Sequence, residues 1–192
     1  LAAACALVSI LFCTIMKYSH FKLKVLMNNT FLRAFVGGLA VVVLTLIVGN
    51  QDYNGAGANI IDAAIMDGQT HWNSFLLKIL FTAITIGAGF KGGEIVPTMF
   101  IGSTFGCAIA PLLGLSPQFG ADVGLDSLFC GVVNCPIASL FLSIEMFGTD
   151  GLLLFALACG VSYMLSGYNA KKTSQKIVYS NLKPKYNNRN PQ

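Results

Sequence analysis

The stretch that decides the fold reads Gly87-Ala88-Gly89-Phe90-Lys91-Gly92-Gly93-Glu94-Ile95-Val96-Pro97-Thr98-Met99-Phe100-Ile101-Gly102 and lies between two apolar runs. The flanking runs are hydrophobic enough to enter a bilayer, so the glycines interrupt the chain at membrane depth. Pro97 is typical of the first turn of a helix. Non-helical backbone at this depth is tolerated only where it is buried in protein or lines a cavity. We therefore expect the stretch to line an anion site, with free backbone N–H groups at a helix N-terminus.

The composition indicates a protein that crosses a membrane several times. Of the 192 residues, 55% are hydrophobic and only 10% are charged, and the mean hydropathy is +0.69. Soluble domains carry about 25% charged residues, so an ordinary cytoplasmic domain is excluded. The net charge of +4 does not indicate nucleic-acid binding, because the basic residues gather at the ends of apolar runs and in the tail. A lipid bilayer is the expected surrounding, and no nucleic acid is expected as a partner.

The cysteines and the other reactive residues indicate neither a metal site nor catalysis. The six cysteines form no C-x-x-C pair, and no histidine lies near any of them. We expect small buried side chains rather than a metal site or a disulfide framework. No Ser/His/Asp set, no H-E-x-x-H motif and no paired intramembrane aspartates are found, and four polar residues of the interlude are expected to face solvent: Asp52, Asp62, Asp67 and His71. No cofactor is expected.

Several apolar runs are short or interrupted, which is typical of discontinuous helices around a binding site at the bilayer midplane. The runs cover residues 1–16, 34–49, 74–90, 97–114, 128–147 and 151–167. Asn134-Cys135-Pro136 is expected to split the fifth run, because proline removes a backbone donor. Residues 116–126 are expected to form a short connection, and the interlude 51–72 a short amphipathic helix. Lys78 is expected to snorkel to the interface, and small residues around Gly102 and Gly106 to pack closely on another helix.

Two basic stretches predict which side faces the cytoplasm. Residues 17–33 carry basic groups and no acid, which predicts a cytoplasmic loop. Residues 171–192 carry six Lys or Arg and no acid. We therefore expect a transmembrane domain over residues 1–170 and a polar, basic cytoplasmic tail over 171–192, disordered at its end. The first run begins at Leu1 with neither a methionine nor a basic region before it. This predicts a fragment of a longer chain rather than a signal peptide.

The two glutamates, Glu94 and Glu145, both lie in segments at membrane depth. An ionisable residue there costs about 3 kcal/mol, so Glu94 beside the glycines is a functional candidate. Alternatively, Glu94 caps its own helix, where a carboxylate is favoured by orphan N–H groups and by the helix dipole. The two hypotheses do not exclude each other. For Glu145, near a helix end, we expect a structural role.

The order of these motifs resembles one family. Gly92 to Pro97, with Met99-Phe100-Ile101-Gly102 after it, is similar to the G-x-F-x-P filter segment of CLC-type chloride channels and anion/proton antiporters. Residues 134–140 and 143–146 are similar to the family's R-A-P-L-T-G…L-E-M segment. The resemblance covers roughly residues 34 to 175, the second half of a CLC protomer. It implies an all-α integral membrane protein of the cell membrane, the second half of an inverted-repeat fold with short, broken and tilted helices, whose protomers pair as homodimers.

The resemblance also implies the site and its ligand. A small anion, chloride or fluoride, would be bound by backbone N–H groups at the helix N-terminus, in exchange for protons. Glutamate after the filter glycine resembles the fluoride-exporting branch, although that branch commonly has threonine two positions later, where this chain has valine. The family's anion-contacting tyrosine corresponds either to Tyr168 or, in the aligned register, to Lys172. The candidate anion-binding residues are Gly93, Glu94, Ile95, Val96 and Tyr168.

Two other functions remain open on the sequence. An intramembrane enzyme could use Glu94 as acid or base, but it needs a second titratable group at the same depth, and the sequence offers only Glu145 in another segment. A scaffold fragment that transports nothing is the third possibility. We expect anion transport, exchange rather than passive conduction, and no enzymatic activity.

Overall fold

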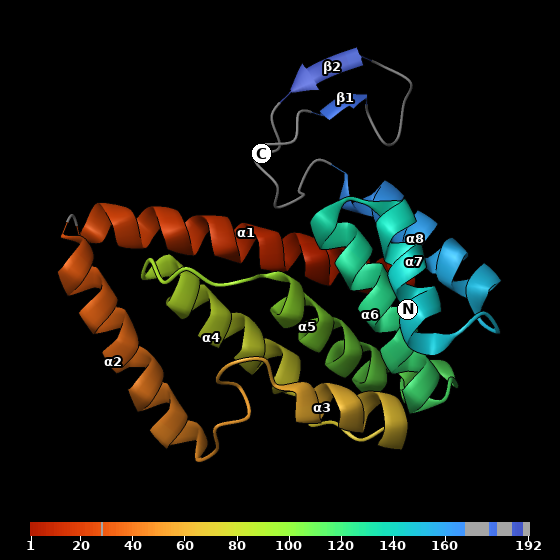
Figure 1. Ribbon diagram of the computed structural model, residues 1–192, viewed down its shortest axis with the longest axis horizontal. Coiled ribbons are helices and arrows are strands. Elements are labelled where there is room, and N and C mark those ends of the chain that lie inside the picture. Colours follow the sequence, from red (N-terminus) through yellow and green to blue (C-terminus); the bar gives the residue numbers. More distant parts are fainter. Residues whose placement is uncertain (28, 168–176, 180–185, 190–192) are drawn as a thin grey trace.

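The chain folds into a bundle of tilted and broken helices (Figure 1). The computed structural model describes residues 1–27, 29–167, 177–179 and 186–189. The helices are α1 (Ala2–Leu26), α2 (Thr30–Val48), α3 (Ala58–Asp62), the π-helix η1 (Ala63–Asp67), α4 (Ser74–Gly87), α5 (Ile95–Ile109), the 3-10 helix η2 (Ala110–Leu113), α6 (Pro117–Val133), α7 (Pro136–Phe147) and α8 (Leu152–Ser166). A short antiparallel pair follows, of β1 (Ile177–Tyr179) and β2 (Tyr186–Arg189).

Within the part of the chain that the structure describes, three helices are long and apolar enough to cross a membrane: Ala2–Leu26, Thr30–Val48 and the continuous segment Ile95–Leu113. The remaining apolar helices α4, α7 and α8 are shorter. This mixture confirms the predicted all-α membrane bundle with short and broken helices. In Figure 1, α1 runs along one edge of the bundle, α4 and α5 lie beneath it, and α6, α7 and α8 gather at one end. The helix α2 diverges from this body, and only Gly37 of its residues is buried.

The centre of the bundle is the contact between α5 and α6, where the two helices touch backbone to backbone. A Cβ atom added to Gly102 would lie 2.7 Å from the carbonyl oxygen of Gly124, and one added to Gly106 would overlap the backbone of Gly120. Glycines let two helices approach closely enough for their backbones to make van der Waals contact. The small-residue face predicted around Gly102 and Gly106 is therefore confirmed, and its partner is α6.

The expected connection over residues 116–126 is wrong, because α6 begins at Pro117. Ser116 is the N-cap of this helix, and its hydroxyl accepts a hydrogen bond from the Phe119 N–H at 3.4 Å. Proline at the first helical position is favoured, because its missing N–H would have had no partner there. The glycines at 120 and 124 are four residues apart, which places both on the face that meets α5.

The expected loop over residues 17–33 is also wrong for most of its length. Helix α1 continues to Leu26, and α2 begins at Thr30, so the link is only three residues long. Two contacts favour the continuation. The Lys22 ammonium lies 4.7 Å from the centre of the Tyr18 ring one turn earlier, and the Ser19 hydroxyl donates to the Ala83 carbonyl of α4 at 2.6 Å.

Other boundaries agree with the sequence. Helix α6 ends at Val133, its C-cap Asn134 has a φ of 58°, and α7 starts with Pro136 at its first position. The split at Asn134-Cys135-Pro136 is confirmed. The short amphipathic helix of the interlude is present as α3 and η1, with Ile61 and Ala64 buried.

Substitution of Gly106 tests the α5–α6 contact. Gly106→Ala would drive a methyl group into the Gly120 backbone, and such overpacking costs about 1–3 kcal/mol. We expect a lower melting temperature in detergent. Gly160→Ala on α8 is the matched control, because nothing lies within 4 Å of its added Cβ. Equal melting temperatures for the two variants would contradict the close contact.

Candidate functional site

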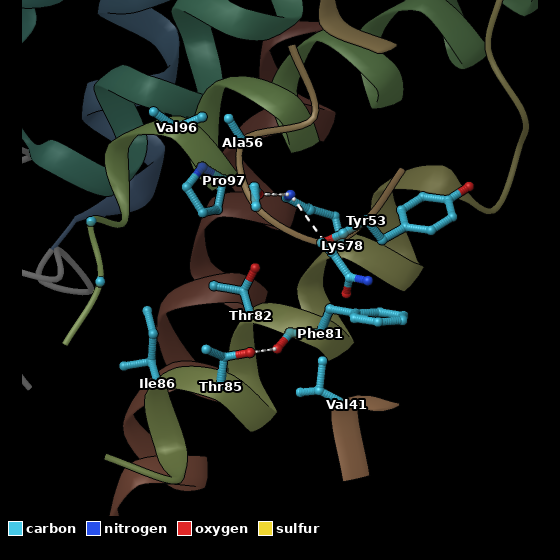
Figure 2. A pocket seen from close by; sticks show the side chains of 14 residues that line it. Val41, Tyr53, Ala56, Lys78, Phe81, Thr82, Thr85, Ile86, Val96 and Pro97 are labelled. Atoms are coloured by element: carbon cyan, nitrogen blue, oxygen red, sulfur yellow. Dashed lines mark hydrogen bonds between the residues drawn. The ribbon is translucent and has the colours of Figure 1, made fainter. Parts of the chain in front are cut away.

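A cavity of about 530 Å³ lies beside α4 and reaches the glycine stretch before α5 (Figure 2). It brings together residues from α2, the loop after α2, α4 and the start of α5. They are Val41, Tyr53, Asn54, Gly55, Ala56, Lys78, Phe81, Thr82, Thr85, Ile86, Gly92, Gly93, Val96 and Pro97. The α4 members recur every three or four residues, so they form one face of that helix.

The start of α5, beside this cavity, has backbone amides that precede the first intrahelical hydrogen bond among the described residues. The first intrahelical bond runs from the Thr98 N–H to the Glu94 carbonyl at 3.1 Å. The amides of Ile95 and Val96 precede that bond, and Pro97 has no N–H to offer. A helix N-terminus also carries a partial positive charge from the aligned peptide dipoles. The geometry at Ile95 and Val96 is therefore suited to a small anion.

The glycine stretch is held from two sides. Gly87 lies against α1, where an added Cβ would overlap the Ser19 hydroxyl, and Gly89 has a φ of 97°, which favours glycine. On the other side, Arg33 of α2 donates from Nε to the Ala88 carbonyl at 3.2 Å. Gly92 and Gly93 differ from these, because nothing lies within 4 Å of a Cβ added to either. They border open space rather than a packing contact.

Lys78 does not snorkel to the interface as expected, because its side chain is only 1% exposed. Its ammonium donates to the carbonyls of Gly55 at 2.7 Å and Tyr53 at 3.2 Å. The same nitrogen lies 4.8 Å from the centre of the Phe100 ring. The folded loop after α2 supplies the two carbonyls, which is why the lysine turns inward.

The predicted anion-binding residues are only partly brought together. Gly93 and Val96 line the cavity, whereas Glu94 and Ile95 do not. Glu94 occupies the N-cap position of α5, but its side chain makes no capping hydrogen bond. Tyr168, and Lys172 as its alternative, lie outside the described residues. Glu145 is exposed on α7 and lies away from the cavity.

Sequence reasoning missed two carboxyl groups on α6, because it expected residues 116–126 to form a connection. Asp122 and Asp126 lie one turn apart on α6. Asp126 is fully buried, and its Oδ1 accepts a hydrogen bond from the Ser143 hydroxyl of α7 at 2.7 Å, while Oδ2 has no partner among the described residues. Neither carboxyl lines the cavity. The Ser116-Pro117 pair, read as a helix start, would have placed both on a helix.

The burial of the cysteines and the exposure of the polar residues of the interlude agree with the expectations from the sequence. All six thiols are free, and five of them are buried. Sγ of Cys130 on α6 and Sγ of Cys159 on α8 lie 2.8 Å apart. Asp52, Asp62, Asp67 and His71 are exposed as predicted. No group of three or more potential metal ligands is found within the described ranges.

Comparison with known proteins identifies the family. Residues 1–167 match the family described as voltage gated chloride channel. The chain belongs to the CLC family. A chloride/fluoride channel protein of Pseudomonas syringae pv. tomato is 35% identical over 163 residues, which cover 82% of this chain and 36% of the relative. An H(+)/Cl(−) exchange transporter of Vibrio vulnificus is 30% identical over 115 residues, 56% of this chain and 24% of the relative.

A solved structure supports the same assignment. The crystal structure of a CLC-type fluoride/proton antiporter superimposes with a TM-score of 0.83 at 32% identity, over 86% of this CLC chain and 42% of that one. The fold is thus that of a multi-pass integral membrane protein, and these relatives are channels and transporters rather than enzymes. The chain spans less than half the length of these proteins.

The surroundings of the glycines predict that alanine destabilises the protein at position 87 but not at position 93. Gly87→Ala forces a methyl group into the Ser19 contact, so we expect a loss of about 1–3 kcal/mol and a lower melting temperature. Gly93→Ala adds a methyl group to open space and should melt like the wild type. Thermal unfolding in detergent compares the two. Destabilisation by Gly93→Ala would mean that Gly93 is a packing residue and does not border an open site.

Proposed function

We propose that this CLC chain carries part of the pathway of an anion/proton antiporter, and that a small anion binds at the N-terminus of α5. The observation that carries the proposal is the cavity bordered by Gly92, Gly93, Val96 and Pro97. The proposed donors are the backbone N–H groups at the start of α5, those of Ile95 and Val96 among them, which precede the first intrahelical bond. The family membership and the named activities of the relatives support anion transport.

A site of backbone amides would bind an anion weakly enough to release it, as transport requires. An anion in the membrane needs donors to replace its lost water, and backbone amides supply them with partial charges only. Binding by partial charges need not become too tight for release. The open space at Gly92 and Gly93 leaves room for the anion to approach the backbone.

Exchange with protons and a preference for fluoride are the finer parts of the proposal. Glu94 directly follows the filter glycine, and the superimposed antiporter is named for fluoride and protons. Val96, in place of the threonine that the branch commonly has, argues for testing chloride beside fluoride. Tyr168 is proposed as a further anion contact.

We further propose that the protomers pair as homodimers in the cell membrane, with a transmembrane domain over 1–170 and a cytoplasmic tail over 171–192. The outer faces of α7 and α8 expose large apolar side chains, which lipid or a second protomer would cover. These are Ile137, Phe141, Leu153, Leu154, Leu157 and Val161.

Ion efflux from liposomes tests the function. Liposomes that contain the protein are loaded with fluoride or with chloride. We expect fluoride to leave faster than chloride and protons to move in the opposite direction. A fluoride electrode, a chloride electrode and a pH-sensitive dye report the three fluxes. Equal chloride and fluoride rates would reject the fluoride preference. No flux of either anion would favour the scaffold alternative.

Glu94→Gln tests the role of the intramembrane glutamate. Glutamine keeps the size of the side chain but cannot ionise, so we expect a changed anion preference or a proton flux reduced about tenfold or more. The melting temperature should stay near that of the wild type, because glutamine keeps the volume of the side chain and a carbonyl oxygen that can accept hydrogen bonds. Unchanged transport combined with a lower melting temperature would assign Glu94 a structural role only.

A further inference from the structure

The cavity contains one full positive charge that the described residues do not neutralise. The Lys78 ammonium is held by two carbonyl oxygens and by the face of the Phe100 ring, and none of these carries a negative charge. No carboxylate forms an ion pair with it among the described residues. A buried charge is costly unless it is paired, so this environment favours an anion as an additional partner.

A second polar group faces the cavity one turn further along α4. Thr82 is 7% exposed, lines the same cavity and forms no hydrogen bond among the described residues. By contrast, the Thr85 hydroxyl donates to the Phe81 carbonyl at 2.8 Å. Figure 2 shows Lys78, Thr82 and Thr85 following one another along the same part of α4. Thr82 therefore offers a hydroxyl donor next to the lysine.

Lys78 and Thr82 belong to α4, whereas the proposed filter site lies at the N-terminus of α5. The cavity extends along this face of α4 and also borders Gly92 and Gly93. An anion held near Lys78 would thus share the cavity with the proposed filter site while contacting different groups.

We propose that Lys78 and Thr82 form a second anion subsite, which holds a halide in the cavity before or after it contacts the α5 N-terminus. The ammonium supplies the charge, and the Thr82 hydroxyl supplies a directional donor. This inference rests on the proposed anion transport, because it assigns a second position to the same substrate. A purely structural role would limit Lys78 to holding the loop at Tyr53 and Gly55.

Halide binding to variants of the two residues tests the subsite. Lys78→Met keeps the length of the side chain without its charge, and Thr82→Val keeps the shape without the hydroxyl. Losing a charge-assisted bond should raise the Kd for fluoride or chloride about tenfold or more, and losing the hydroxyl about three- to tenfold. Thr104→Val is the control, because that buried threonine lies outside the cavity and bonds the Phe100 carbonyl.

Titration calorimetry with sodium fluoride and sodium chloride, on protein in detergent, gives the Kd. Efflux from liposomes is measured on the same samples. If Lys78→Met fails to fold, Thr82→Val decides, since the Thr82 side chain supports no described hydrogen bond. The subsite would be overturned if the wild type transports anions and Thr82→Val, together with any folded Lys78→Met, binds halide with unchanged affinity. The proposed function would stand in that case. A wild type that moves no anion would overturn the proposed function itself.

Discussion

The backbone contact between α5 and α6 is the constraint on which the rest of the structure depends. Glycines on both helices bring the two backbones into contact, and this fixes the position and tilt of α5. The helix α6 in turn packs against α1, α7 and α8, so it forms the centre of the bundle. The direction of α5 decides where its first amides point. The proposed site is made of backbone N–H groups and has no side chain that could adjust for a misplaced helix, so its geometry would depend on this packing.

Much of the fold could be predicted because membrane helices leave a strong composition signal. The helix after the glycines, the break at Pro136 and the final apolar helix follow from runs of apolar residues and from proline. The errors occurred where two signals conflict. Residues 117–126 contain glycines and aspartates typical of a turn, yet a serine cap and a close helix contact make them helical. Residues 17–26 are basic, yet contacts with α4 and within α1 keep them helical.

Of the candidate site, only the residues of the glycine-rich motif before α5 could be predicted from the sequence. Gly93 and Val96 were identified from the order of glycine, glutamate and proline, and both line the cavity. Lys78 was not identified, because its inward direction depends on the carbonyls of Tyr53 and Gly55, more than 20 residues away in sequence. The burial of Asp126 depends likewise on Ser143 from a later helix. Such pairings arise from tertiary packing and leave no local pattern.

The attachment of α2 to the glycine stretch has a mechanical consequence. Arg33 is bonded to the Ala88 carbonyl, and Gly37 one turn further along α2 lies directly against the Ala88 side chain. Further along α2, Val41, Leu44 and Val48 pack against the core around Tyr53 and Phe81, while the outer side of the helix exposes apolar side chains. Because Arg33 and Gly37 contact Ala88, a tilt of α2 would displace the loop attached to it. The surrounding bilayer, or a protein surface packed on α2, would therefore reach the backbone that precedes the proposed anion site.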